Sequence, residues 1–254
     1  FILLGVGALV FITVPSGIFL RRRPEDLNLL PDGAAHFIAD DKNYQEPIPI
    51  ENEYSWTLQQ ARRTPTLWVL TIGMALGLAA QIAMNVHVVA SFEDQGVSQT
   101  LSVTVVTIFG GVSAISMMPW GFFAERVHTR LVAMICMALY MISMIVLLAF
   151  DVSYGVAVVF AIIFGLATGG WTVSQSLIVA SYFGRLHAGA IRGFTAPLEG
   201  LIAISGPLVA AVIRDSTGAY EAAFWAITVA FGAAFAAFFF AMPQKTPLLP
   251  LKQD

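Results

Sequence analysis

The amino-acid sequence predicts an all-α polytopic membrane protein, and three observations support this fold class. Hydrophobic residues make up 57% of the chain and charged residues only 11%, whereas a soluble domain carries about 25% charged residues. The hydrophobic residues gather in seven long apolar runs, of which we take the first to be incomplete. Positive charge falls almost entirely on one set of alternate loops. A chain of this kind cannot cover itself with polar surface in water, so we expect it to lie in lipid.

The length of each apolar run indicates whether it can cross a membrane. Crossing the roughly 30 Å hydrocarbon core of a bilayer takes about 20 apolar residues in a helix. The candidate spans are 1–20, 66–91, 101–123, 131–150, 155–182, 196–213 and 222–242. The loops after the second span are short, so we expect sequential helices to be antiparallel neighbours. Those loops cover residues 92–100, 124–130, 151–154, 183–195 and 214–221.

The lysines and arginines predict the orientation. All of them except Arg214 lie on one set of alternate loops: Arg21, Arg22, Arg23, Lys42, Arg62, Arg63, Arg126, Arg130, Arg185, Arg192, Lys245 and Lys252. Because cytoplasmic loops carry an excess of lysine and arginine, we expect this set to face the cytoplasm.

Residues 21–64 differ from the rest of the chain, with four prolines, many acidic residues and little apolar periodicity. This pattern predicts a cytoplasmic linker that is partly disordered. Residues 56–63 can form a short amphipathic helix at the interface before Pro65 starts the next span. We therefore expect a partial helix at 1–20, the linker at 21–64, a six-helix bundle at 65–243 and a cytoplasmic tail at 244–254. Because the chain starts inside an apolar helix, we interpret it as the C-terminal part of a longer protein.

Small residues recur at spacings typical of helix packing. In lipid, such residues let two backbones approach closely. The candidates are Gly73 with Gly77, Gly165 with Gly169, and Gly200 with Gly206. Prolines interrupt two spans, at Pro119 and at Pro197 and Pro207, where kinks are expected.

The segment joining the third and fourth spans carries a motif: Gly121, then three residues, Glu125, Arg126, and later Arg130. It resembles the loop motif of the major facilitator superfamily, with His128 where the family usually has glycine. This resemblance makes Gly121, Glu125, Arg126 and Arg130 gate candidates. An acid and an arginine at a helix end can pair with a neighbouring helix and bias inward and outward states. The alternative is that these charges are solvated and only anchor the topology.

A second resemblance concerns residues 21–33, which read RRRPEDLNLLPDG. They look like the start of the central linker in monocarboxylate and oxalate/formate-type members of that superfamily. The two resemblances imply the C-terminal bundle of a twelve-helix fold, preceded by the last helix of the N-terminal bundle. They imply a secondary transporter of a small organic solute, with a monocarboxylate as the suggested class, working by alternating access. Protons or substrate exchange would drive it, and a bacterial inner membrane is the implied location.

Two spans carry polar side chains suited to a substrate cavity. Gln81 and Asn85 are four residues apart and share a helix face in the outward half. The fifth span carries a polar stripe and a tryptophan too deep for the interfacial aromatic belt. These residues are Thr168, Trp171, Thr172 and Gln175. The alternative is that the polar groups only join helices through hydrogen bonds.

Glu199 is the one acidic residue within a predicted span. A charge at the bilayer centre costs about 2.5–3.5 kcal/mol on insertion scales, so the residue is a candidate for proton coupling or gating. The alternative is a structural partner of Arg192 or of a helix end. For His87, near the outer boundary of its span, we expect an interfacial, water-exposed ring. Monocarboxylate-type members often hold a cation in the second half, but these spans contain no lysine or arginine. Either the missing half supplies it, or the substrate is not an anion bound that way.

An enzyme is not expected. The four histidines are scattered over separate loops and helix ends, no acidic pair lies in any predicted span, and no metal-ligand spacing or glycine-rich phosphate loop appears. We therefore predict no cofactor, no metal and no nucleic-acid partner, and Cys136, the single cysteine, excludes an intramolecular disulfide. The predicted partners are membrane lipid, a small solute and protons. Alternatives to the coupled transporter are a uniporter of the same fold and a membrane sensor that kept the fold but lost turnover.

Overall fold

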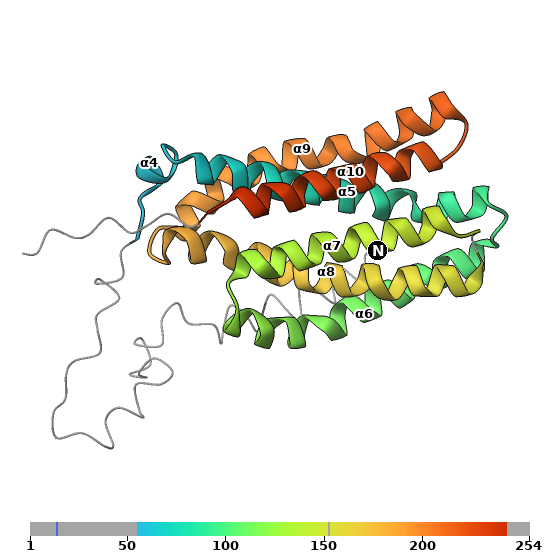
Figure 1. Ribbon diagram of the computed structural model, residues 1–254, viewed down its shortest axis with the longest axis horizontal. Coiled ribbons are helices and arrows are strands. Elements are labelled where there is room, and N and C mark those ends of the chain that lie inside the picture. The colour runs from blue at the N-terminus through green and yellow to red at the C-terminus, as the bar shows by residue number, and fades with distance from the viewer. Residues whose placement is uncertain (1–13, 15–54, 152, 243–254) are drawn as a thin grey trace, which may run out of the picture. The chain divides into compact units, whose positions relative to one another are not determined.

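The computed structural model describes Val14, residues 55–151 and residues 153–242. The expected linker up to residue 54 and the tail at 244–254 lie outside the described residues, as does the partial helix at 1–20 apart from Val14. In the part of the chain described from residue 55 there are helices and no strands (Figure 1). The helices are α4 (Leu58–Ala61), α5 (Pro65–Asp94), α6 (Gln99–Arg126), α7 (Thr129–Ala149), α8 (Tyr154–Phe183), α9 (Ala188–Thr217) and α10 (Glu221–Phe240).

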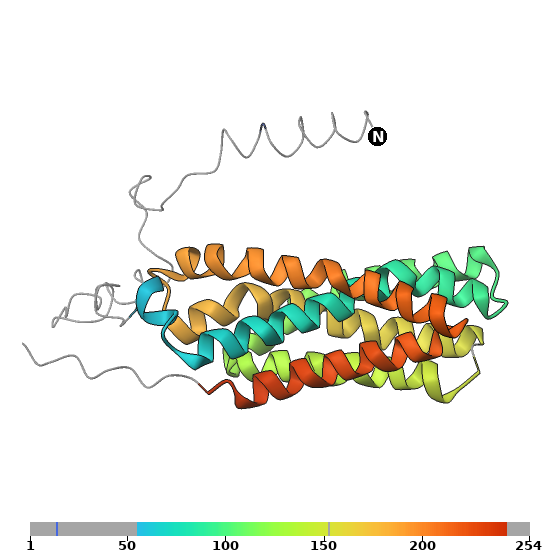
Figure 2. The same cartoon turned by 90° about the horizontal axis from the view of Figure 1, so that it is seen from above.

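Six of these helices, α5 to α10, are long and apolar enough to cross a membrane. They confirm the predicted fold class and all six spans expected after residue 65. Successive helices run in opposite directions, as Figure 2 shows. We call the end of the bundle near α4 the linker end and the opposite end, with the loops after α5, α7 and α9, the far end.

The predicted limits of one span are wrong. The apolar run predicted helix over 196–213, whereas α9 covers Ala188–Thr217, so most of the expected loop at 183–195 is helical. Hydropathy locates the part of a helix that lies in hydrocarbon, but a helix extends beyond it wherever its polar side chains find partners. Arg192 is such a residue, since Glu199 on the same helix binds its guanidinium.

The short helix expected at 56–63 exists as α4, Leu58–Ala61. A capping box starts it: the Thr57 hydroxyl accepts from the backbone of Gln60, and the Gln60 side chain accepts from the backbone of Thr57. Its location at a membrane interface stays a prediction.

The six long helices pack as two groups of three, which form the two layers visible in Figure 1. One group contains α5, α9 and α10, and the other contains α6, α7 and α8; α7 and α10 join them. The expectation that sequential helices are neighbours holds for α7 and α8 but is wrong for α6, which packs mainly against α8 and scarcely against α7. Short loops set the direction of the next helix, but side-chain packing decides its neighbour.

Close approaches hold each group together. A Cβ at Gly169 of α8 would lie 2.7 Å from the Ser113 carbonyl oxygen of α6, and one at Gly206 of α9 would lie 2.2 Å from the Ala79 carbonyl oxygen of α5. Glycine is therefore required at both crossings. The expectation for Gly200 is not met among the described residues, since a Cβ there meets no atom within 4 Å.

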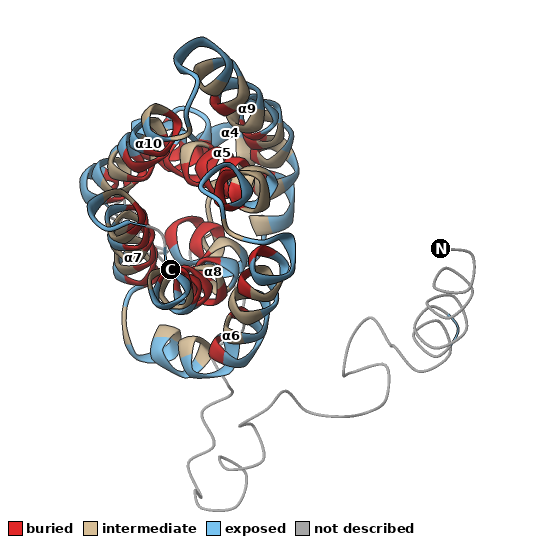
Figure 3. Ribbon diagram, turned by 90° about the vertical axis from the view of Figure 1, so that its right-hand side faces the viewer, coloured by how far each residue is buried: buried red, intermediate tan, exposed pale blue. Residues whose placement is uncertain are grey.

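Buried residues line the inner faces of the six helices (Figure 3). Many of the exposed residues on the outside are large and apolar. The two least buried helices are α6 and α9, with exposed side chains such as Ile115, Met118, Leu201 and Leu208. An apolar exterior of this extent suits lipid or a further membrane-embedded partner rather than water.

Candidate functional site

The first cluster of polar groups within the bundle is the ion pair of Arg192 and Glu199, seven residues apart on α9. Nη1 of Arg192 lies 2.7 Å and 2.6 Å from the two carboxylate oxygens of Glu199. The Glu199 side chain is 3% exposed and that of Arg192 is 32% exposed, so the guanidinium connects a buried charge to the surface of the described bundle. The structure thus pairs Glu199 with Arg192, as the alternative of a structural partner expected. The role of Glu199 in proton coupling stays a prediction.

The second cluster surrounds Trp171 of α8, which is fully buried. Its ring packs 5.8 Å from that of Phe238, and a Cβ at Gly77 of α5 would lie 3.4 Å from it. The indole Nε1 is buried and has no hydrogen-bond partner among the described residues. Trp171 thus lies between helices, and its predicted role in lining a cavity is not tested.

A tyrosine of α7 binds one residue of the polar stripe of α8. Tyr140 of α7 stacks on Phe231 of α10 at 4.5 Å, and its hydroxyl donates to Thr168 at 3.1 Å. Thr168 is therefore engaged in joining helices, whereas Thr172 is exposed and Gln175 half-buried.

The polar residues of α5 and α8 are not brought together by direct bonds. Gln81 is buried and Asn85 exposed, so the two residues predicted to share a face differ in their surroundings. No hydrogen bond between described residues joins either of them to the α8 stripe. Sequence reasoning missed Tyr140, because a tyrosine inside an apolar run carries no signal of its partner.

The loop motif separates into two parts. Glu125 and Arg126 are exposed and form no ion pair with another described residue, and a Cβ at Gly121 would meet nothing within 4 Å. Arg130, by contrast, donates to the Phe239 carbonyl at the end of α10, and its guanidinium lies over the Phe239 ring.

Arg130 is one of three side chains that fasten the carboxyl end of α10. The Tyr182 hydroxyl of α8 donates to the Ala241 carbonyl at 2.7 Å, and Thr66 of α5 donates to the Met242 carbonyl at 3.2 Å. A cation near these carbonyls also complements the helix dipole. In this conformation Arg130 stabilises the end of α10, and its predicted role as a gate stays a prediction.

The third cluster lies at the far end. We call it the far-end network: His87 and Asp94 of α5, Pro207 and Arg214 of α9, and Tyr220 before α10. His87 Nε2 lies 3.0 Å from the Pro207 carbonyl oxygen, and Nδ1 lies 3.2 Å from the Tyr220 hydroxyl. Arg214 lies 2.9 Å from Asp94 and over the Tyr220 ring. We expected a water-exposed His87 ring, but it is half-buried because both nitrogens bind neighbouring segments.

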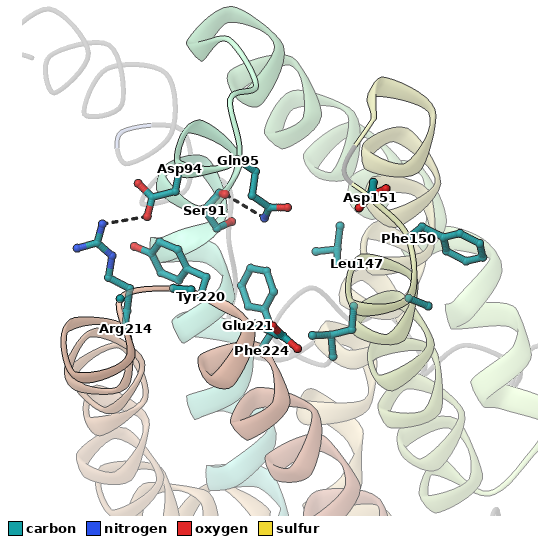
Figure 4. A pocket seen from close by; sticks show the side chains of 14 residues that line it. Ser91, Asp94, Gln95, Leu147, Phe150, Asp151, Arg214, Tyr220, Glu221 and Phe224 are labelled. Carbon is teal, nitrogen blue, oxygen red and sulfur yellow. Dashed lines mark hydrogen bonds and ion pairs between the residues drawn. The ribbon is translucent and has the colours of Figure 1, made fainter.

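The far-end network borders a cavity of about 520 Å³ (Figure 4). Its lining combines apolar side chains, such as Leu147 and Phe224, with Asp94, Asp151 and Glu221. Partial burial is the largest effect on the pKa of the Tyr220 hydroxyl and raises it. None of the cavity residues predicted from the sequence borders this space. It lies closer to the far end of the bundle than they do, among the loops.

The similarity of the chain to a known family agrees with this architecture. The family model of the Major Facilitator Superfamily matches residues 84–254. The match starts within α5 and covers α6 to α10, including the loop motif at residues 121–130. A comparison with curated proteins gave no significant match.

Proposed function

Because this chain belongs to the Major Facilitator Superfamily, we propose that it forms the C-terminal half of a secondary transporter that moves a small organic solute by alternating access. The observation that carries this proposal is the family match over a bundle of membrane-length helices. The linker resemblance favours a monocarboxylate as the solute. In this proposal the outer faces of α6 and α9, which are the least buried, meet the N-terminal half.

The charge distribution supports a cytoplasmic linker end. Of the arginines in residues 55–242, only Arg214 lies at the far end, where acidic side chains gather. Positive charge is retained on the cytoplasmic side of membrane proteins. The far end then opens to the outside.

Glu199 is the proposed coupling or gating residue. Its partner Arg192 lies on the same helix, so the pair can separate without pulling two helices apart. A proton on Glu199 would release Arg192, and a free guanidinium at that level can bind a carboxylate solute. The polar residues Gln81, Asn85, Thr172 and Gln175 are the proposed cavity lining.

Counterflow in proteoliposomes tests the function. The full chain is reconstituted, loaded with unlabelled lactate or formate, and exposed to the labelled compound outside. Transient accumulation of label supports the transporter, and a folded protein without it supports the sensor alternative. Uptake that persists with a protonophore favours the uniporter or an exchanger. If Glu199→Gln leaves proton-driven uptake unchanged, the coupling role is wrong.

A further inference from the structure

At the far end, two contacts join α5 to α9 in one register. His87 meets the Pro207 carbonyl at 3.0 Å, and Asp94 meets Arg214 at 2.9 Å; both pairs are 120 residues apart in the sequence. The two helices therefore run parallel without slippage over roughly 10 Å, at about 1.5 Å per residue.

The chemistry of His87 makes it a bridge between three segments. The Pro207 carbonyl can only accept, so Nε2 carries the hydrogen of that bond. In the neutral ring, Nδ1 then accepts from the Tyr220 hydroxyl, which leads into α10. A protonated ring donates to the same two partners, because the hydroxyl also accepts. The bridge therefore survives a change in the charge of His87.

The bridge lies at one of the two prolines inside α9. Pro207 has no N–H, so the Ala203 carbonyl lacks its usual donor within the helix. One residue earlier, Gly206 packs directly on the backbone of Ala79. Helix α9 is thus tied to α5 on both sides of Pro207, a point where a helix bends easily.

We propose that the far-end network ties the far segment of α9 and the start of α10 to α5, so that these three far ends move as one unit, with His87 as the positioning residue. The inference that these ends move during a transport cycle rests on the proposed function, whereas the inference that they are tied to one another does not. Among the described residues no hydrogen bond or ion pair joins the far ends of α7 and α8 to α5, which meets α8 there through the edge-to-face rings of Phe92 and Phe160 at 6.1 Å. We therefore expect relative motion at the far end to fall between the two three-helix groups.

Distances between spin labels test this tie in the full chain, reconstituted in liposomes with Cys136→Ala as background. Labels at Glu93 and Ser216, both exposed and outside the network, report α5 against α9. Labels at Glu93 and Tyr154 report α5 against α8 as the control pair. We expect one narrow distance for the first pair, with and without a proton gradient, even where the control pair shifts.

Variants identify the groups responsible. His87→Ala is expected to broaden the distribution of distances between the labels at Glu93 and Ser216. His87→Gln keeps a donor near the Nε2 position, so its distribution should be nearly as narrow as that of the parent. Tyr220→Phe removes one hydroxyl without altering the ring and should broaden this distance distribution partly. Asp94→Arg should broaden it, and the charge swap with Arg214→Asp should narrow it again.

Two distances for the first pair in the unmodified network would overturn the tie. A distribution in His87→Ala and Tyr220→Phe as narrow as in the parent would also overturn it. A narrow first distance in a protein that shows no counterflow would support the tie and count against the proposed transporter. The two proposals therefore fail on different measurements.

Discussion

Replacing Gly206 with alanine tests the closest approach of a described glycine to the backbone of another helix. The new Cβ would lie 2.2 Å from the Ala79 carbonyl oxygen and 2.8 Å from its carbon, whereas nonbonded carbon atoms settle at about 3.5–4.0 Å. Because the obstacle is backbone, no rotamer change relieves the overlap, and α9 must move away from α5 by roughly 1 Å. Overpacking costs about 1–3 kcal/mol, and the better helix propensity of alanine returns about 1 kcal/mol.

We therefore expect Gly206→Ala to lower the free energy of unfolding by up to about 2 kcal/mol, and the melting temperature by up to about 8 °C. Thermal unfolding of the purified full chain, followed by tryptophan fluorescence, measures this change. Gly232→Ala is the matched control, since a Cβ there meets the Met141 side chain at an ordinary 3.6 Å. It should melt at or above the parent temperature. If Gly206→Ala melts no lower than Gly232→Ala, the close crossing of α5 and α9 is refuted.

Three further predictions concern other contacts. Arg192→Gln leaves the Glu199 carboxylate buried without its cation, so the free energy of unfolding should fall by roughly 3 kcal/mol. Adding Glu199→Gln should recover most of this loss in the same melting assay. Tyr140→Phe removes the bond to Thr168 and should cost about 1 kcal/mol, whereas an unchanged melting curve would mean that this bond contributes nothing. Burial and the charge of Arg130 lower the pKa of His128, so the unfolded chain binds the proton first. Stability should then fall as the pH drops below about 6.5, and His128→Gln should flatten this dependence between pH 7 and pH 5.

The arginines show how far local sequence information extends. Arg192 and Glu199 are two helical turns apart, so their pairing follows from spacing once residue 192 is known to be helical. Sequence analysis assigned Arg192 to a loop, because hydropathy reports only the segment in hydrocarbon. The alternative of a structural partner for Glu199 nevertheless named the correct residue. Arg130 was selected through the family motif, but its contact with the end of α10 joins positions 109 residues apart, and no local pattern predicts it.

The far-end network shows the same limit more strongly. Its members are a histidine, a proline, a tyrosine and one ion pair from three segments. His87, Pro207 and Arg214 each attracted notice in the sequence, but for unrelated reasons, and nothing local joined them. The expected exposed ring of His87 became a half-buried bridge because α9 lies beside α5. Had the register of the two helices been known, the matching positions of Asp94 and Arg214 would have indicated the pair.

By itself, the sequence determined membrane integration, the number of helices after residue 65 and the segregation of positive charge. These are local properties, since each segment must satisfy its own backbone hydrogen bonds and present apolar side chains to hydrocarbon wherever it lies. Only the tertiary structure decided that α5 pairs with α9 and α6 with α8, and hence which polar groups meet. Neighbours are chosen by the fit of small residues and side-chain surfaces across helices, because lipid is as apolar as the helices and gives no hydrophobic preference for one partner over another.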